Sequence, residues 1–106
     1  MNTTAFLRIL HTEASLGWGG QEIRLLGESR AMIGRGHEVR LLCPPDSRIS
    51  AEALRYQIPV TVAPMGRKNL TGLFAVRSWL AAHPADVVVT HSSTDSWLVA
   101  LASQTL

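Results

Sequence analysis

The feature that most constrains the fold of this chain is a regular alternation of short apolar runs with longer amphipathic segments. Runs of strand length occupy residues 6–12, 37–44, 58–64 and 86–91. Segments with apolar residues at helical spacing occupy residues 21–36, 47–57, 70–82 and 96–104. Such an order is typical of βαβ units, whose right-handed crossovers place helices on both faces of a parallel sheet. We therefore predict a Rossmann-like three-layer α/β/α fold with a parallel sheet of four strands in the order 3-2-1-4.

The boundaries of these elements carry their own signals. Gly36 stops the first helix, and Pro44 and Pro45 end the second strand because proline cannot donate to a strand ladder. Asp46 or Ser47 can cap the short second helix, and residues 92–95 supply cap residues for the last helix.

The last apolar run, DVVVTH, lacks the inward and outward alternation of a half-exposed strand. Such a strand is expected to be covered on both faces, near the middle of a sheet. In the order 3-2-1-4 it nevertheless lies at the edge, so we expect further structure beyond it that lies outside this chain. A bare edge also predicts a homo-oligomer, formed through the fourth strand or the terminal helix.

Composition limits the function classes. With 106 residues, 46% hydrophobic and 17% charged, the chain has the make-up of one ordinary domain. No run approaches the roughly 18 apolar residues of a membrane span, and the start lacks a cationic leader, so we predict a cytoplasmic protein. The single cysteine, Cys43, lies in an apolar run and is expected to be a buried, inert thiol.

The basic residues are almost all arginine and are spread along the chain, and the formal net charge is only +2. This pattern does not favour a nucleic-acid partner. Arg67 and Lys68 could contact anionic lipid or phosphate, or could belong to a solvated loop, and Arg77 could face an acceptor or a membrane.

The predicted topology places any ligand site beyond the carboxyl ends of the first and fourth strands, where the strand order reverses. Two segments follow those strands, His11–Gly20 and His91–Asp95. Glycines let backbone amides approach a ligand, and a helix beginning at Gly20 or Gln21 would point its N–H groups at the same place. The loop could therefore contact an anion or a sugar, or its glycines could merely serve a turn that needs positive φ.

The other side chains of these segments leave two interpretations each. Trp18 could stack on a ligand or cover the core. His91 could act as a base or a hydrogen-bond donor, while His11 is expected to be structural or to support another residue. The four histidines have no metal-ligand spacing, so no metal is predicted.

Four segments in order, GWGGQEIRLL, RGHEVRLLCP, IPV and PADVVVTHSSTDSW, carry a resemblance to a known family. Together they resemble the amino-terminal domain of a retaining family 4 (group 1) glycosyltransferase of the GT-B fold. The family patterns G-G-x-E, R-G-H-E-V and P-D-V-V-x-x-H fall at residues 19–22, 35–39 and 84–91, with Ala85 inserted in the last.

The resemblance implies roles for individual residues. Gly19 and Gly20 would present amides to the donor diphosphate or the transferred sugar, and His91 would be the catalytic residue beside the reaction centre. Gly17, Trp18 and Ser92 complete the predicted substrate-binding set. Glu22 would anchor the helix start, pair with Arg24 or contact the ligand. Arg35, His37 and Glu38 would form a turn that packs helix against strand. No cofactor is implied beyond a nucleotide sugar as co-substrate.

The resemblance also implies that residues 1–106 are part of a larger enzyme. They would form a partial amino-terminal, acceptor-side domain, with the carboxyl-terminal nucleotide-sugar domain absent and no cationic clamp for the leaving diphosphate, so the fragment alone would be inactive. The acceptor would be a glycan or lipid of a cell-envelope polysaccharide pathway, with peripheral contact to the inner face of the membrane. The alternative is a non-catalytic βαβ module that binds a small anion or a protein partner.

Overall fold

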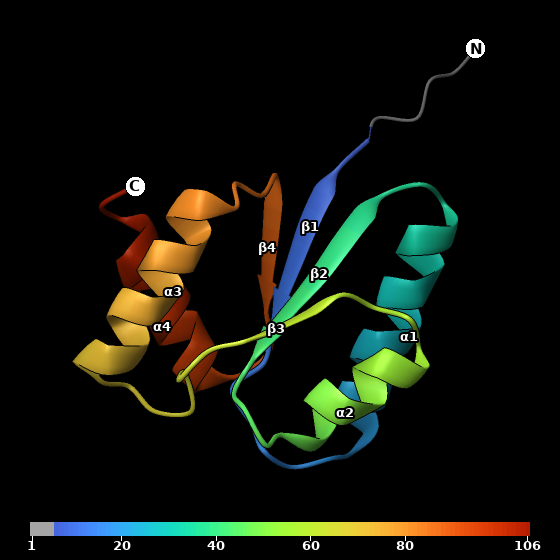
Figure 1. Cartoon of the computed structure of the whole chain (residues 1–106), viewed down its shortest axis with the longest axis horizontal. Coiled ribbons are helices and arrows are strands. Elements are labelled where there is room, and N and C mark those ends of the chain that lie inside the picture. The colour runs from blue at the N-terminus through green and yellow to red at the C-terminus, as the bar shows by residue number, and fades with distance from the viewer. Residues whose placement is uncertain (1–5) are drawn as a thin grey trace.

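The computed structural model describes residues 6–106, which form four strands that alternate with four helices (Figure 1). The strands are β1 (Arg8–Thr12), β2 (Glu38–Cys43), β3 (Val60–Val62) and β4 (Val87–Thr90). The helices are α1 (Gly20–Gly34), α2 (Arg48–Arg55), α3 (Leu70–Ala82) and α4 (Ser93–Ser103).

All strand pairs in the sheet are parallel, and the strand order is β3-β2-β1-β4. The predicted order 3-2-1-4 is therefore confirmed. In the β1–β4 pair Ile9 lies opposite Val87 and Thr12 lies opposite Thr90, so the two strands end at the same level. This register places the residues that follow β1 beside those that follow β4.

The helices cover the two faces of the sheet in pairs, α3 and α4 on one side and α1 and α2 on the other (Figure 1). Leu10 and Leu42 pack against Val76 of α3 and Leu98 of α4. On the other face Leu41 packs with the two buried leucines of α1 and with Ile49 and Ala53 of α2. The two cores make the three-layer α/β/α arrangement that was predicted.

The start of α4 is the clearest difference from the predicted boundaries. The helix begins at Ser93 rather than at residue 96, because Ser92 and Asp95 form a reciprocal capping box in which each side chain accepts from the other's backbone N–H. Asp95 therefore lies inside the first turn, where its charge also interacts favourably with the helix dipole.

Strand β4 is only partly covered, contrary to the expectation from its apolar sequence. Val87 is 41% exposed and Val88, Val89 and Thr90 are half-buried. The reason is that β4 has a single neighbour, β1, and that α1 leaves an open hollow over this part of the sheet. We call this the α1–β4 hollow; it is lined by residues that include Ile9, His11, Glu28, Met32, Val87 and Val89.

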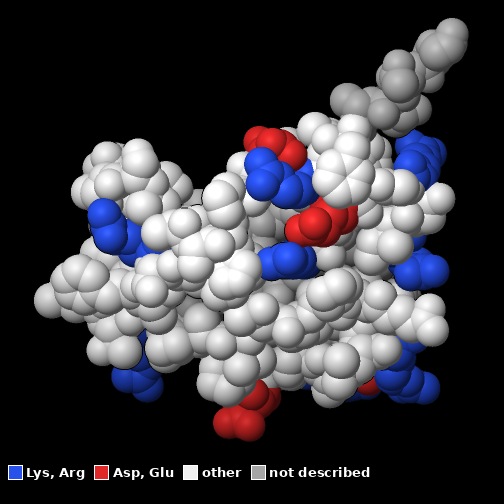
Figure 2. Space-filling view, turned by 45° about the horizontal axis from the view of Figure 1, so that its top comes forward, with Lys and Arg blue, Asp and Glu red and all other residues white. Residues whose placement is uncertain are grey.

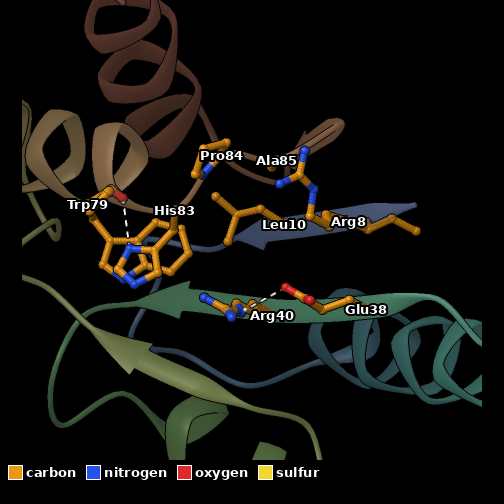
Figure 3. Close-up of a pocket in the computed structure, with 10 residues that line it drawn as sticks. Arg8, Leu10, Glu38, Arg40, Trp79, His83, Pro84 and Ala85 are labelled. Carbon is orange, nitrogen blue, oxygen red and sulfur yellow. Dashed lines mark hydrogen bonds and ion pairs between the residues drawn. The ribbon is translucent and has the colours of Figure 1, made fainter. Parts of the chain in front are cut away.

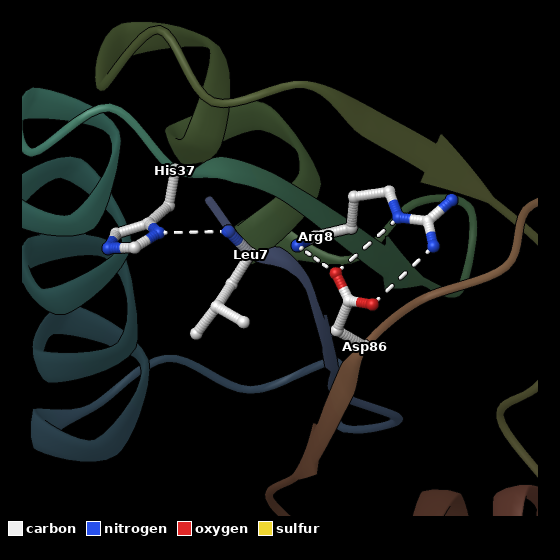
Figure 4. A network of polar contacts seen from close by, with 4 residues as sticks. All are labelled: Leu7, Arg8, His37 and Asp86. Atoms are coloured by element: carbon white, nitrogen blue, oxygen red, sulfur yellow. Dashed lines mark hydrogen bonds and ion pairs between the residues drawn. The ribbon is translucent and has the colours of Figure 1, made fainter. Parts of the chain in front are cut away.

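The RGHEV segment forms the tight turn that was predicted between α1 and β2. Gly36 has a φ of +93°, a conformation that favours glycine. His37 then accepts a hydrogen bond at Nδ1 from the backbone N–H of Leu7, 3.1 Å away, which ties the turn to the start of β1 (Figure 4). Beside it, Arg8 and Asp86 exchange backbone and side-chain hydrogen bonds that join β1 to β4, and these bonds lower the pKa of Asp86.

Within residues 6–106, no helix is long and apolar enough to cross a membrane. Cys43 is buried in the core between the sheet and α2, as expected, and burial raises the pKa of its thiol. A buried thiol with a raised pKa is a poor nucleophile.

Candidate functional site

The two segments that leave β1 and β4 are joined by hydrogen bonds at the carboxyl edge of the sheet. Gln21, in the first turn of α1, donates from Nε2 to the carbonyl oxygen of His91 over 2.7 Å. The same Nε2 donates to Oε1 of Glu13, also over 2.7 Å. The glycine loop and the segment after β4 therefore meet at the carboxyl edge of the sheet, where the ligand crevice is predicted.

A buried carboxylate, Asp95, holds the second segment in place. Its Oδ2 accepts from Thr12 Oγ1 at 2.6 Å and from the backbone N–H of His91 at 2.9 Å. Its Oδ1 accepts from the backbone N–H and the hydroxyl of Ser92. Because Thr12 belongs to β1, this carboxylate links the end of β1 to the start of α4.

The imidazoles of His11 and His91 form a second link across the crevice. Nδ1 of His11 lies 2.9 Å from Nε2 of His91, and the rings stack with centroids 5.1 Å apart. His11 is only 6% exposed, and His91 is half-buried. Burial, together with the neighbouring His91, lowers the pKa of His11 from 6.5 to about 4, although the charge of Glu28 acts in the opposite direction. His11 is therefore neutral at pH 7.

The loop glycines are not explained by backbone conformation. Among residues 6–106, Gly36 is the one glycine with a positive φ, so Gly17, Gly19 and Gly20 do not serve a left-handed turn. A Cβ atom added at Gly20 would meet nothing within 4 Å, and at Gly19 only the Glu22 carboxylate at 3.6 Å. The space beside Gly20 is therefore not filled by the described chain.

Trp18 lies on the side of the loop that faces α2. Its ring packs against the core of α1, α2 and β2, and the guanidinium of Arg48 lies 5.2 Å from the ring centroid. This contact is the one expected of a loop tryptophan that covers the core rather than one that stacks on a ligand. Glu22 is buried at the start of α1, and within residues 6–106 no ion pair joins it to Arg24.

Sequence reasoning missed several residues of this crevice. Glu13 is fully buried and accepts from Gln21 and from the backbone N–H of Ser15, yet nothing in a lone glutamate after a strand predicted its burial. Asp95 was predicted only as a possible cap. The spacing S-x-x-D at residues 92–95 would have found the capping box, but not the bond to Thr12.

The comparison with family models supplies the deciding observation. The model described as "Glycosyl transferase 4-like domain" matches residues 19–106. The chain belongs to this family. Comparison with curated proteins finds no match, and neither does comparison with solved structures. Membership favours the glycosyltransferase interpretation over the non-catalytic module.

The opposite, amino-terminal edge of this glycosyltransferase 4-like domain carries a different hollow of about 230 Å³ (Figure 3). Arg8, Arg40, Trp79 and His83 line it, and the last two rings stack at 4.3 Å. Each arginine is paired with a neighbouring acid, Arg8 with Asp86 and Arg40 with Glu38 at 3.2 Å. His37 and His83 thus lie far from the crevice, as the topology predicted.

Two further features of residues 6–106 are the distribution of their charged side chains and that of their possible metal ligands. On the face that Figure 2 shows, lysine and arginine side chains lie in separate small groups rather than in one stripe. Within the part of the chain that the structure describes, no three histidine, cysteine, aspartate or glutamate side chains are grouped so that they could hold a metal ion.

Proposed function

We propose that this domain is the acceptor-side half of a sugar-nucleotide-dependent, retaining glycosyltransferase, and that transfer takes place in the crevice at the carboxyl ends of β1 and β4. The observation that carries the proposal is the convergence of the glycine loop and His91 on that crevice in a member of a glycosyltransferase family. Open α/β sheets bind ligands at this topological position.

The start of α1 is suited to the donor. The N–H groups of a helix's first turn have no partner within the helix, and the dipole favours an anion there. Gly19 and Gly20 add no side chain of their own over this helix end, and no side chain caps it. In this proposal they bring backbone amides against the diphosphate or the transferred sugar, and Gly17 shapes the approach through its bond to Ser15 Oγ.

His91 is suited to contact hydroxyl groups beside the reaction centre. Its backbone is held at both ends, by Gln21 at the carbonyl and by Asp95 at the N–H, so that its half-buried ring is positioned before a ligand arrives. Preorganised groups of this kind contribute to catalysis because they need no reorganisation during the reaction. In this proposal Ser92 also contacts the substrate beside His91, although its hydroxyl donates to Asp95.

The nucleotide and the cationic groups for its phosphates are assigned, in this proposal, to a second domain. The crevice would then bind donor and acceptor only weakly by itself, and residues 1–106 alone would be inactive. A leaving diphosphate needs compensation of its growing negative charge, and such compensation is worth several kcal/mol in the transition state.

The proposal can be tested by titrating UDP-glucose, GDP-mannose and simple glycosides into ¹⁵N-labelled protein. We expect millimolar affinity, with amide shift changes confined to residues 17–21 and 91–95. Shift changes elsewhere, or none in these segments, would contradict the site. Submicromolar binding would contradict the division of labour between two domains.

A matched pair of variants sharpens this test. Gly20→Ala adds a methyl group that meets nothing in the chain but projects into the proposed ligand space, and Gly27→Ala adds one on the exposed face of the same helix. Both substitutions should keep or slightly raise stability. Only Gly20→Ala should weaken binding, and equal binding by the two variants would exclude a backbone contact at Gly20.

For the membrane contact, α3 supplies specific support. Leu70 and Phe74 are one helical turn apart and are 66% and 63% exposed, and the exposed Arg67 and Lys68 precede them. Apolar side chains flanked by cations are typical of surfaces that bind anionic lipid. We expect co-sedimentation with vesicles that contain anionic lipid, and its loss in Leu70→Ser/Phe74→Ser. The guanidinium of Arg77, on the same helix, binds Thr105 over 2.5 Å.

We also propose self-association of the isolated chain through β4 or α4. Val87 is exposed on the unpaired edge, and Trp97 and Leu101 are each 36% exposed on α4. Unpaired strand edges readily pair with another chain. Sedimentation should show a dimer or larger species at tens of micromolar, and a monomer at that concentration would contradict the proposal.

A further inference from the structure

The contact between His11 and His91 is not used by the proposed function. It joins two ring nitrogens at 2.9 Å, so one imidazole donates its N–H and the other accepts. His11 is buried, and its lowered pKa of about 4 means that it carries no second proton at neutral pH. The contact therefore holds one proton, and its direction decides which nitrogen of His91 remains for a ligand.

Two arrangements of the ring protons are consistent with the 2.9 Å distance between His11 Nδ1 and His91 Nε2. In the first, His11 donates from Nδ1, its Nε2 is bare, and a neutral His91 keeps its own proton on Nδ1. In the second, His91 donates from Nε2, and His11 keeps its proton on Nε2. The two arrangements differ at both outer nitrogens, so the surroundings of the outer Nε2 of His11 can distinguish them.

Glu28 is the acidic residue whose charge acts on His11, and because Nδ1 of His11 is occupied by the contact with His91, Nε2 is the nitrogen left for other partners. Both residues line the α1–β4 hollow, and the carboxylate of Glu28 favours a proton on His11. Arg35 lines the same hollow two helical turns further along α1, about 10 Å away toward the amino edge of the sheet. A carboxylate stabilises an N–H that points toward it and destabilises a bare lone pair, which favours the second arrangement.

We propose that His11 is a positioning residue that holds His91 in the Nε2–H tautomer, so that the bare Nδ1 of His91 is the atom that accepts a hydrogen bond from a substrate hydroxyl. This inference rests on the proposed function, since it names the atom and the polarity of the contact. The ligand group recognised at His91 is then a hydroxyl donor rather than a carbonyl or phosphate oxygen.

The tautomer can be read directly from long-range ¹H–¹⁵N correlations of the histidine rings in the ligand-free protein at pH 7. Single His→Gln variants at positions 37 and 83 assign the remaining signals. We expect a protonated-type Nε2 and a pyridine-type Nδ1 for His91, with a protonated Nε2 for His11. The opposite pattern, or a rapid average of both tautomers, would overturn the inference.

Two matched variants test the cause. Glu28→Gln removes the carboxylate charge that acts on His11, and Glu52→Gln removes a charge from α2, which does not line the hollow. We expect the Nδ1 signal of His91 to move toward the tautomer average in Glu28→Gln and to stay in place in Glu52→Gln. A shift of equal size in both variants would overturn the role of Glu28.

The outcome is separable from that of the proposed function, because the tautomer is measured without a ligand. A reversed tautomer in a protein whose crevice still binds glycosides refutes only this inference. The expected tautomer in a protein whose crevice binds neither glycosides nor nucleotide sugars refutes the proposed function, and with it the hydroxyl contact, but leaves the positioning role of His11 intact. His11→Phe, which removes the acceptor of the His91 N–H, should release the tautomer preference, and unchanged ¹⁵N signals of His91 would contradict the positioning role.

Discussion

Replacing Asp95 by alanine should destabilise the domain more than any other single substitution in the crevice. The side chain is fully buried, caps α4 and accepts from Thr12 Oγ1 of β1 at 2.6 Å. Its loss therefore affects a helix start and a contact between two segments of the sheet at once.

The magnitude follows from these two roles. Loss of an N-terminal cap costs about 1 kcal/mol. Loss of a hydrogen bond to a buried charged group costs about 1.5–3 kcal/mol. We expect Asp95→Ala to lower the free energy of unfolding by about 3 kcal/mol, which in a domain of this size corresponds to a fall in Tm of more than 10 °C. Ser92→Ala, which removes only the cap hydroxyl, should cost about 1 kcal/mol.

The assay is urea unfolding followed by circular dichroism on Asp95→Ala, Thr12→Val and the double variant. Valine keeps the shape of threonine without its hydroxyl, so the double-mutant cycle isolates the contact between the two side chains. We expect a coupling energy of about 1.5 kcal/mol or more. Strictly additive effects, or a loss below about 1 kcal/mol in Asp95→Ala, would refute the role of Asp95 as the link between β1 and α4.

Three further outcomes are expected. Because the pKa of His11 is about 4 in the fold and 6.5 when unperturbed, the unfolded chain binds more protons between these values, and stability should fall as the pH falls from 6.5 to 4. The loss should be roughly 2 kcal/mol after allowance for solvent screening. It is measured from the urea midpoints of the native protein and of His11→Gln, each at pH 7 and at pH 4.5. The fall in midpoint between the two pH values should be larger in the native protein. Gly72→Ala should cost about 1–3 kcal/mol in thermal unfolding, because its Cβ would lie 2.9 Å from the carbonyl oxygen of Pro64, whereas Gly27→Ala should not destabilise. Cys43 should react with iodoacetamide only at the rate of global unfolding, and rapid labelling of the folded protein would show that its burial is incomplete.

The sequence by itself determined the element order, the parallel sheet and the edge at which the crevice lies. These properties depend on local periodicity and on turn residues, such as Gly36 and the prolines after β2, which act within a few positions of the chain. It also placed His91 and the glycine loop at the same edge, because the carboxyl ends of parallel neighbours meet there.

Only the tertiary structure decided how the side chains of that edge contact one another. His11 and His91 are 80 positions apart, and their pairing depends on the register that sets Thr12 opposite Thr90. The burial of Glu13 and the bond from Thr12 to Asp95 have the same origin. Periodicity reports which face of an element a residue occupies, whereas the partner across a crevice is selected by register and packing, which no local pattern contains.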